Sequence, residues 1–167
     1  MKTLNHSILS IVLSLSLFAC TRKAEQAAQY NDVIIQQQKD IIAAFDQFDS
    51  TFTDSLASKE RIEFAFVNMQ SNIKRSLLSL DSIGPFQKDP LLEQAARELF
   101  KAYDEMVEAE YRVLKDIKLM PAESITAPMI DTTISVQIRI HDTSKLAQEK
   151  FLKMQEEFGK KYNLVFE

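Results

Sequence analysis

Glycine and proline, the residues that most often interrupt helices, are scarce in this sequence. The 167 residues include two glycines and four prolines. Between these breaks, apolar residues recur at steps of three and four over long stretches, which is the period of one face of an α-helix. The chain is therefore predicted to be all-α, with a few long amphipathic helices.

The periodic stretches divide into four helices. We expect them over residues 24–52, 59–80 and 90–120, with the fourth after a connection at 121–129. Short connections place successive helices side by side in opposite directions. The sequence thus predicts an antiparallel up-down-up-down four-helix bundle.

Side chains that favour helix starts support two of these boundaries. Ser58 is a suitable N-cap for the second helix, and Glu60 lies in its first turn. Asp89 can cap the third helix, while Pro90 gives up only an amide that has no partner at the first helical position.

The apolar face of each helix is predicted to form the core. Its expected members are Ala27, Tyr30, Ile34, Ile41, Phe45, Phe48, Phe52, Ile62, Phe66, Met69, Ile73, Leu77, Leu80, Leu92, Ala95, Leu99, Tyr103, Met106, Val113, Ile117, Val136, Ile140, Ala147, Phe151, Met154 and Phe158. Phe64 and Phe100 extend the aromatic part of this set. An apolar ligand cavity lined by these rings is the alternative to a packed core.

The start of the fourth helix has a second interpretation. Ile134, Val136, Ile138 and Ile140 alternate with polar residues, which is also the pattern of a β-strand. A helix is preferred over residues 130–141, because the sequence offers no second strand with which this one would pair.

The first twenty residues have a different pattern. Lys2 precedes an apolar run at residues 8–18, which is too short to cross a bilayer that needs about twenty helical residues. The run ends in Leu17-Phe18-Ala19-Cys20, and Cys20 is the only cysteine. This arrangement resembles the signal peptide and lipobox of bacterial lipoproteins. The resemblance implies cleavage before Cys20 and a diacylglycerol on its thiol.

The lipobox defines the expected domain organisation. Residues 1–19 are the cleaved signal peptide, residues 20–23 a lipidated tether, and residues 24–167 a single helical bundle domain. An even number of antiparallel helices brings the end of the chain back beside Cys20. Cys20 and the C-terminal residues are then expected at the membrane end of the bundle.

The lipoprotein resemblance also implies a location. The lipid on Cys20 makes the membrane the first expected partner. No aspartate follows Cys20, which in enterobacterial lipoproteins favours the outer membrane. Some Gram-negative lipoproteins carry an acidic cluster as a tag for export to the cell surface. This cluster is missing here, which favours the periplasmic face of the membrane.

Two further runs resemble a group of uncharacterised helical surface lipoproteins of Gram-negative bacteria. They are Tyr30-Asn31-Asp32 at the start of the first helix and Lys161-Tyr162-Asn163-Leu164 at the end of the fourth. This resemblance implies export and a helical fold, and it brings no activity with it.

Charge and cysteine content exclude several classes of function. Removing residues 1–19 takes away one lysine and no acid, which moves the formal charge from −4 to −5. Lysines and arginines are scattered among a larger number of acids, so no nucleic-acid partner is expected. Once Cys20 is acylated, no thiol remains for a disulfide or a cysteine nucleophile.

The sequence offers few catalytic or metal-binding candidates. His141 is the one histidine of the mature chain, and no glutamate lies three residues before it, as a di-iron bundle would need. A Ser-His-Asp triad stays open, because its members meet in space. Glu105 and Glu108 could face a cation together, although such runs more often form a solvated face. We expect no enzyme, no metal and no cofactor.

The connection between the third and fourth helices is unusually apolar. Met120, Ile125, Met129 and Ile130 lie in or beside it. Either these residues fold back and seal the end of the core, or they form the surface where an envelope protein partner docks.

These observations lead to one functional expectation and one alternative. The chain is expected to be a membrane-anchored helical binding or structural module of the cell envelope. The alternative is a carrier of small apolar ligands or lipids in a cavity between the helices.

Overall fold

The structure, a computed structural model, describes the backbone of residues 4–164 and the side chains of residues 22–164. Over this range the chain is helical and contains no β-strand. In chain order the elements are α1 (Leu4–Thr53), α2 (Lys59–Ile83), α3 (Leu91–Met106), the π-helix η1 (Val107–Tyr111), α4 (Arg112–Leu119), the short 3-10 helix η2 (Ala122–Ser124) and α5 (Ala127–Tyr162). The all-α prediction is confirmed, and residues 130–141 are helix rather than strand.

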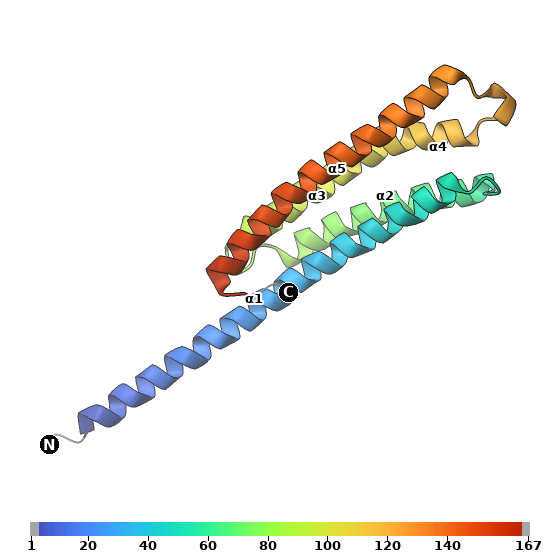
Figure 1. Cartoon of the computed structure of the whole chain (residues 1–167). Coiled ribbons are helices and arrows are strands. Elements are labelled where there is room, and N and C mark those ends of the chain that lie inside the picture. The colour runs from blue at the N-terminus through green and yellow to red at the C-terminus, as the bar shows by residue number, and fades with distance from the viewer. Residues whose placement is uncertain (1–3, 165–167) are drawn as a thin grey trace.

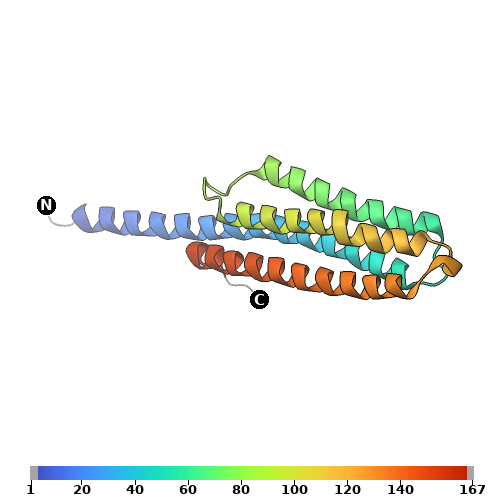
Figure 2. The ribbon, with the colours of Figure 1, turned by 90° about the horizontal axis from the view of Figure 1, so that it is seen from above.

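The helices lie side by side as long rods (Figure 1, Figure 2). α1 packs along α2, while α3 and its continuation pack along both α2 and α5. The loop at 84–90 and the end of α5 lie beside residues 22–30 of α1, and we call this the near end because it is closest to Cys20. The loops at 54–58 and 120–126 lie at the opposite end, the far end, where Lys118 Nζ donates to the Asp54 carbonyl at 3.0 Å.

α1 begins much earlier than Ala24, where the sequence pattern suggested a start. Its backbone is helical from Leu4, so residues 20–23 continue the helix instead of forming an extended link. No glycine or proline occurs before residue 84, so the backbone has no reason to break here. At 1.5 Å per residue, residues 20–23 span about 6 Å along the helix axis. The proposed division at Cys20 itself stays a prediction.

The start of α2 agrees with the sequence. Ser58 Oγ accepts a hydrogen bond from the Arg61 N–H at 3.3 Å, which is the N-cap geometry, and Glu60 lies in the first turn. The helix continues to Ile83, three residues beyond the predicted end. It stops at Gly84, whose φ of 60° is readily adopted only by a residue without a Cβ.

The third predicted helix is continuous over α3, η1 and α4. Asp89 Oδ1 accepts a hydrogen bond from the Leu91 N–H at 3.2 Å, as expected of a cap, although the helix begins at Leu91 rather than Pro90. The π-helical turn η1 then inserts one extra residue. Leu114 consequently takes the inward position predicted for Val113, which is half-buried.

Large aromatic and aliphatic side chains from all the long helices form one core. Phe48 is fully buried and meets Tyr111 edge to face, with ring centroids 5.3 Å apart. Phe45 stacks on the same tyrosine ring at 5.2 Å. Phe64 is a correction to the sequence analysis, because its side chain is 64% exposed on the outer side of α2. Most of the predicted aromatic set is therefore packed core.

A strained turn connects α2 to α3 at the near end. The Asp89 N–H donates to the Phe86 carbonyl at 2.8 Å, which closes a four-residue turn. Its two central residues, Gln87 and Lys88, have φ values of 49° and 69°. Glycine, asparagine and aspartate are the usual residues at such positions, and other side chains are strained there.

Replacing Lys88 by glycine should therefore stabilise the protein. The free energy gained by relieving backbone strain exceeds the free-energy cost of the extra entropy of glycine in the unfolded chain. We expect the free energy of unfolding to rise by about 0.5–1 kcal/mol. Urea denaturation followed by circular dichroism measures it. Lys59→Gly, in the first turn of α2, is the control and should destabilise the protein, whereas a loss of stability in Lys88→Gly would contradict the turn geometry.

Candidate functional site

Cys20, the predicted lipidation site, belongs to α1 by its backbone. Its side chain lies outside the described residues, so lipidation stays a prediction. In the part of the chain that is described, no helix carries an apolar run sufficient to span a bilayer. Arg22 and Lys23 follow within the same turn of α1 and are exposed.

Four aromatic rings close the near end of the core. They come from α1, the 84–90 loop and α5, and belong to Tyr30, Phe86, Phe158 and Tyr162. Phe86 lies 5.4 Å from Tyr30 and 5.0 Å from Tyr162 between ring centroids. Tyr30 Oη also donates to the Gly84 carbonyl at 2.6 Å. The two runs that resembled surface lipoproteins, around Tyr30 and Tyr162, are thus brought together here by packing.

Asp89 ties the loop to the end of α5. Its Oδ2 accepts hydrogen bonds from Tyr162 Oη at 2.9 Å and Lys161 Nζ at 2.8 Å, and its Oδ1 accepts from the Leu91 N–H. Burial raises the pKa of this carboxyl, but the hydrogen bonds from Lys161, Leu91 and Tyr162 outweigh it, and the pKa lies below its ordinary value.

Asp89→Asn should lower stability at neutral pH by about 1–3 kcal/mol, because a charged acceptor of three hydrogen bonds is lost. A carboxyl group whose pKa is lower in the folded state stabilises the fold at every pH above its pKa in the unfolded chain. This stabilisation is lost as the pH falls through the lower pKa of the folded state. The difference between the two proteins should therefore shrink below about pH 4. Thermal melts across pH measure it. Asp81→Asn, which breaks an exposed pair with Arg97, is the control and should cost less than about 1 kcal/mol.

The predicted partner loop lies at the far end. Met120 and Ile130 are exposed, Ile125 and Met129 are half-buried, and all four lie outside the main core. The sealing interpretation requires burial, which Met120 and Ile130 do not have. An apolar surface is therefore present where the sequence placed a candidate docking loop.

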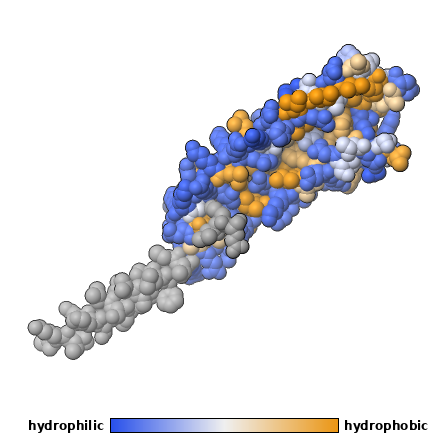
Figure 3. Space-filling view, viewed as in Figure 1, coloured by the Kyte–Doolittle hydropathy of each residue, from blue (hydrophilic) through white to orange (hydrophobic). Residues whose placement is uncertain are grey.

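This surface continues along α5 in a way that the sequence analysis missed. Ile130, Ile134 and Ile138 are 53%, 51% and 57% exposed, and together we call them the outer α5 stripe. Steps of four residues place them on one helical face, opposite the fully buried Val136. Figure 3 shows an elongated hydrophobic patch at the far end, on the side where α5 begins. In a helix over residues 130–141, the alternating residues divide between two faces. Ile134 and Ile138 lie on the outer face, and Val136 and Ile140 lie on the face toward the core.

A small apolar groove lies between α3 and α5. It has a volume of about 220 Å³, and Glu98 and Lys150 form an ion pair beside it at 2.5 Å. The apolar lining residues are Ala95, Leu99, Ala102, Leu146, Ala147 and Phe151. A groove of this size is smaller than most pockets for drug-sized ligands.

Of the two acidic candidates of the third predicted helix, Glu105 is exposed on the surface and Glu108 is bound by neighbouring side chains. Glu108 accepts hydrogen bonds from Gln70, at 2.6 Å, and from Arg112. The hydrogen bond from Gln70 and the charge of Arg112 hold the Glu108 pKa below its ordinary value, against a smaller effect of burial. His141 is exposed on α5. Among the described residues, no three His, Cys, Asp or Glu side chains are grouped so that they could hold a metal ion.

Comparison of the chain with models of known protein families, with curated proteins and with solved structures finds no match.

Proposed function

We propose that this chain is a lipoprotein of the bacterial cell envelope, anchored through Cys20 to the periplasmic face of the outer membrane, and that it acts as a helical binding module. The domain is an antiparallel up-down-up-down four-helix bundle. The near end faces the membrane, and the far end presents a docking surface to an envelope protein.

The placement of the loops supports this arrangement. Tyr30 contacts the 84–90 loop and Phe158 of α5, so three segments of the chain meet close to Cys20. Lys118 and Asp54 bring the other two connections together at the far end. A partner would therefore approach the end that extends away from the bilayer.

The outer α5 stripe is the observation that carries the binding role. Its three isoleucines are each more than half exposed, although a monomeric surface helix normally has polar residues on this face. Met120, at the end of α4, extends the apolar surface at the far end. Exposed apolar patches of this kind mark protein contacts, and burial of the three side chains by a partner would supply the hydrophobic centre of an interface.

Paired surface variants test this proposal. Ile134→Ser with Ile138→Ser removes most of the stripe, while Phe64→Ser with Val67→Ser removes equally exposed apolar side chains from the outer side of α2. Both proteins should keep their stability, because none of these side chains is buried. Each is used to capture proteins from envelope membranes, with the unaltered lipidated protein as reference. A partner that the α5 variant loses and the α2 variant retains supports the proposal, and equal capture by all three contradicts it.

The groove between α3 and α5 favours one alternative, a carrier of small apolar ligands. Ala102→Phe would fill this groove, whereas Ala57→Phe, in the loop at the far end, would not. If lipids copurify with the protein and only Ala102→Phe releases them, the carrier role is supported over the binding module.

A further inference from the structure

Basic residues that are scattered in the sequence gather at the near end. Three segments form its outermost layer, at residues 22–25 of α1, 84–89 of the loop and 160–164 of α5 and the residues after it. Their basic members are Arg22, Lys23, Lys88, Lys160 and Lys161, and their acidic members are Glu25 and Asp89. The whole chain has the opposite balance, with 20 basic and 24 acidic residues. The fold therefore separates charge along its axis.

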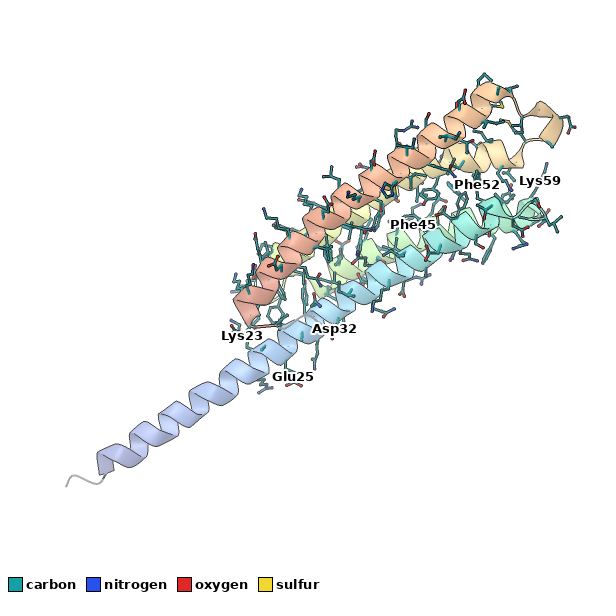
Figure 4. All side chains as sticks on the ribbon, viewed as in Figure 1. Lys23, Glu25, Asp32, Phe45, Phe52 and Lys59 are labelled. Carbon is teal, nitrogen blue, oxygen red and sulfur yellow. The ribbon has the colours of Figure 1, made fainter. Side chains whose placement is uncertain are left out.

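Contacts between the segments hold two of these cations, Lys23 and Lys161, in the layer. Lys23 Nζ lies 5.1 Å above the centre of the Tyr162 ring, which joins α1 to α5. Lys161 pairs with Asp89 of the loop at 2.8 Å. Figure 4 shows Lys23 beside the end of α5, with Lys59 at the opposite end of the molecule. These two contacts join the three segments, which brings their basic side chains to the same end of the molecule.

The acids of this layer neutralise it only in part. The Asp89 side chain is 10% exposed and directs its oxygens at Lys161, Tyr162 and the start of α3. Glu156, the partner of Lys160, lies one helical turn further from the near end. Lys88, displayed by the strained turn, is exposed together with Arg22. Glu25 is the other acid of the layer and is exposed, but the layer has five basic residues against these two acids, so its face is predominantly positive.

Apolar atoms accompany the charge. Ile83, the last residue of α2, and Pro85 of the loop are both exposed, on either side of Gly84. Basic side chains with a few exposed apolar residues are the combination found at surfaces that lie against lipid headgroups.

We propose that the near end is an electrostatic membrane-contact surface, which binds the phosphate groups of anionic phospholipids in the leaflet that holds the anchor. This inference rests on the proposed lipid attachment at Cys20, because that lipid brings the layer to the bilayer. The continuous helix from Cys20 to Lys23 keeps the distance to a few ångströms. Together, anchor and cations hold the bundle upright and direct the outer α5 stripe away from the membrane.

A site-specific fluorescent probe tests the contact. Cys20 is the only cysteine and is acylated in the mature protein, so a new cysteine is the only free thiol. Pro85→Cys places the probe in the near-end loop, and Leu56→Cys places it at the far end, where Leu56 is 89% exposed. The lipidated proteins are reconstituted in zwitterionic vesicles, with or without phosphatidylglycerol as about a third of the lipid. Spin-labelled headgroups quench any probe that lies against the surface.

Charge reversal provides the second variable. Arg22→Glu, Lys88→Glu and Lys160→Glu are combined in one variant, and Lys59→Glu, Lys74→Glu and Lys145→Glu form a control with the same change of net charge. All six residues are exposed, so both variants should fold, and circular dichroism checks this. Each basic residue near an anionic surface changes the occupancy of the bound state by about fivefold.

Phosphatidylglycerol should increase quenching at residue 85 and leave residue 56 unchanged. The increase should disappear in the near-end variant and in high salt, and persist in the control variant. Quenching at residue 85 that is independent of phosphatidylglycerol, or equal in the two variants, would overturn the inference. Vesicle flotation separates the two proposals: proteins that do not float contradict lipid attachment, whereas proteins that float without charge-dependent quenching contradict only the contact surface.

Discussion

Phe48→Ala should lower the free energy of unfolding by about 3–5 kcal/mol, which is the usual range for removing a buried phenylalanine ring. Phe48 has no exposed surface, and its ring meets those of Phe52, Phe66 and Tyr111. The surrounding helices cannot close such a cavity without moving one another. Urea denaturation of the detergent-solubilised protein, followed by circular dichroism, measures the loss.

Phe64→Ala is the matched control, because it makes the same chemical change at a ring that is 64% exposed. It should cost well under 1 kcal/mol. Met106→Ala belongs with Phe48→Ala and should cost about 2–5 kcal/mol, while Glu108→Ala on the exposed side should cost less than about 1 kcal/mol. Equal losses in the buried and exposed variants would mean that the core lies on other helix faces.

Cys20→Ser should abolish attachment of the lipid. The hydroxyl group of serine does not replace the thiol that receives the diacylglycerol, so the protein should remain an uncleaved precursor or lose its lipid. A clickable palmitate analogue, fed to cells and read by gel fluorescence, measures this directly. Ser16→Ala, within the apolar run, should leave labelling intact. Palmitate incorporation into the Cys20→Ser protein would show that the lipid is attached at another residue.

The boundaries of the helices could be predicted where a local side chain determines them. Ser58 caps α2 through its own hydroxyl group, and this signal gave the start of the helix correctly. The end of α2 was placed three residues too early, at residue 80, although the backbone freedom of Gly84 is a local signal for the observed end. The core faces of α2 and α5 follow from the same logic, because burial follows the helical period.

The shift of the core face at η1 could not be predicted in this way. A period of 3.6 residues extrapolated through Tyr111 places Val113 inward, whereas the π-turn moves Leu114 there. Tyr111 is held between Phe45 and Phe48, so tertiary packing stabilises the extra residue. Nothing in the neighbouring sequence indicates it.

The outer α5 stripe and the basic layer at the near end could not be predicted without the tertiary structure. The outer α5 stripe became visible only once residues 130–141 were known to be helix, since the strand interpretation would place Ile134 and Val136 on the same face. The basic layer combines Arg22, Lys88 and Lys161 from segments far apart in the chain. No local pattern joins them.

Intact-mass spectrometry of the protein extracted from membranes can decide whether a lipid on Cys20 holds the helical domain to the membrane. We expect a chain of 148 residues that begins at Cys20 and carries the additional mass of a diacylglycerol, with or without an N-terminal acyl chain. Fragmentation should assign all of that mass to the first residue. A chain that still begins at Met1, or one that begins at Cys20 with no added mass, would show that Cys20 is not the lipid anchor.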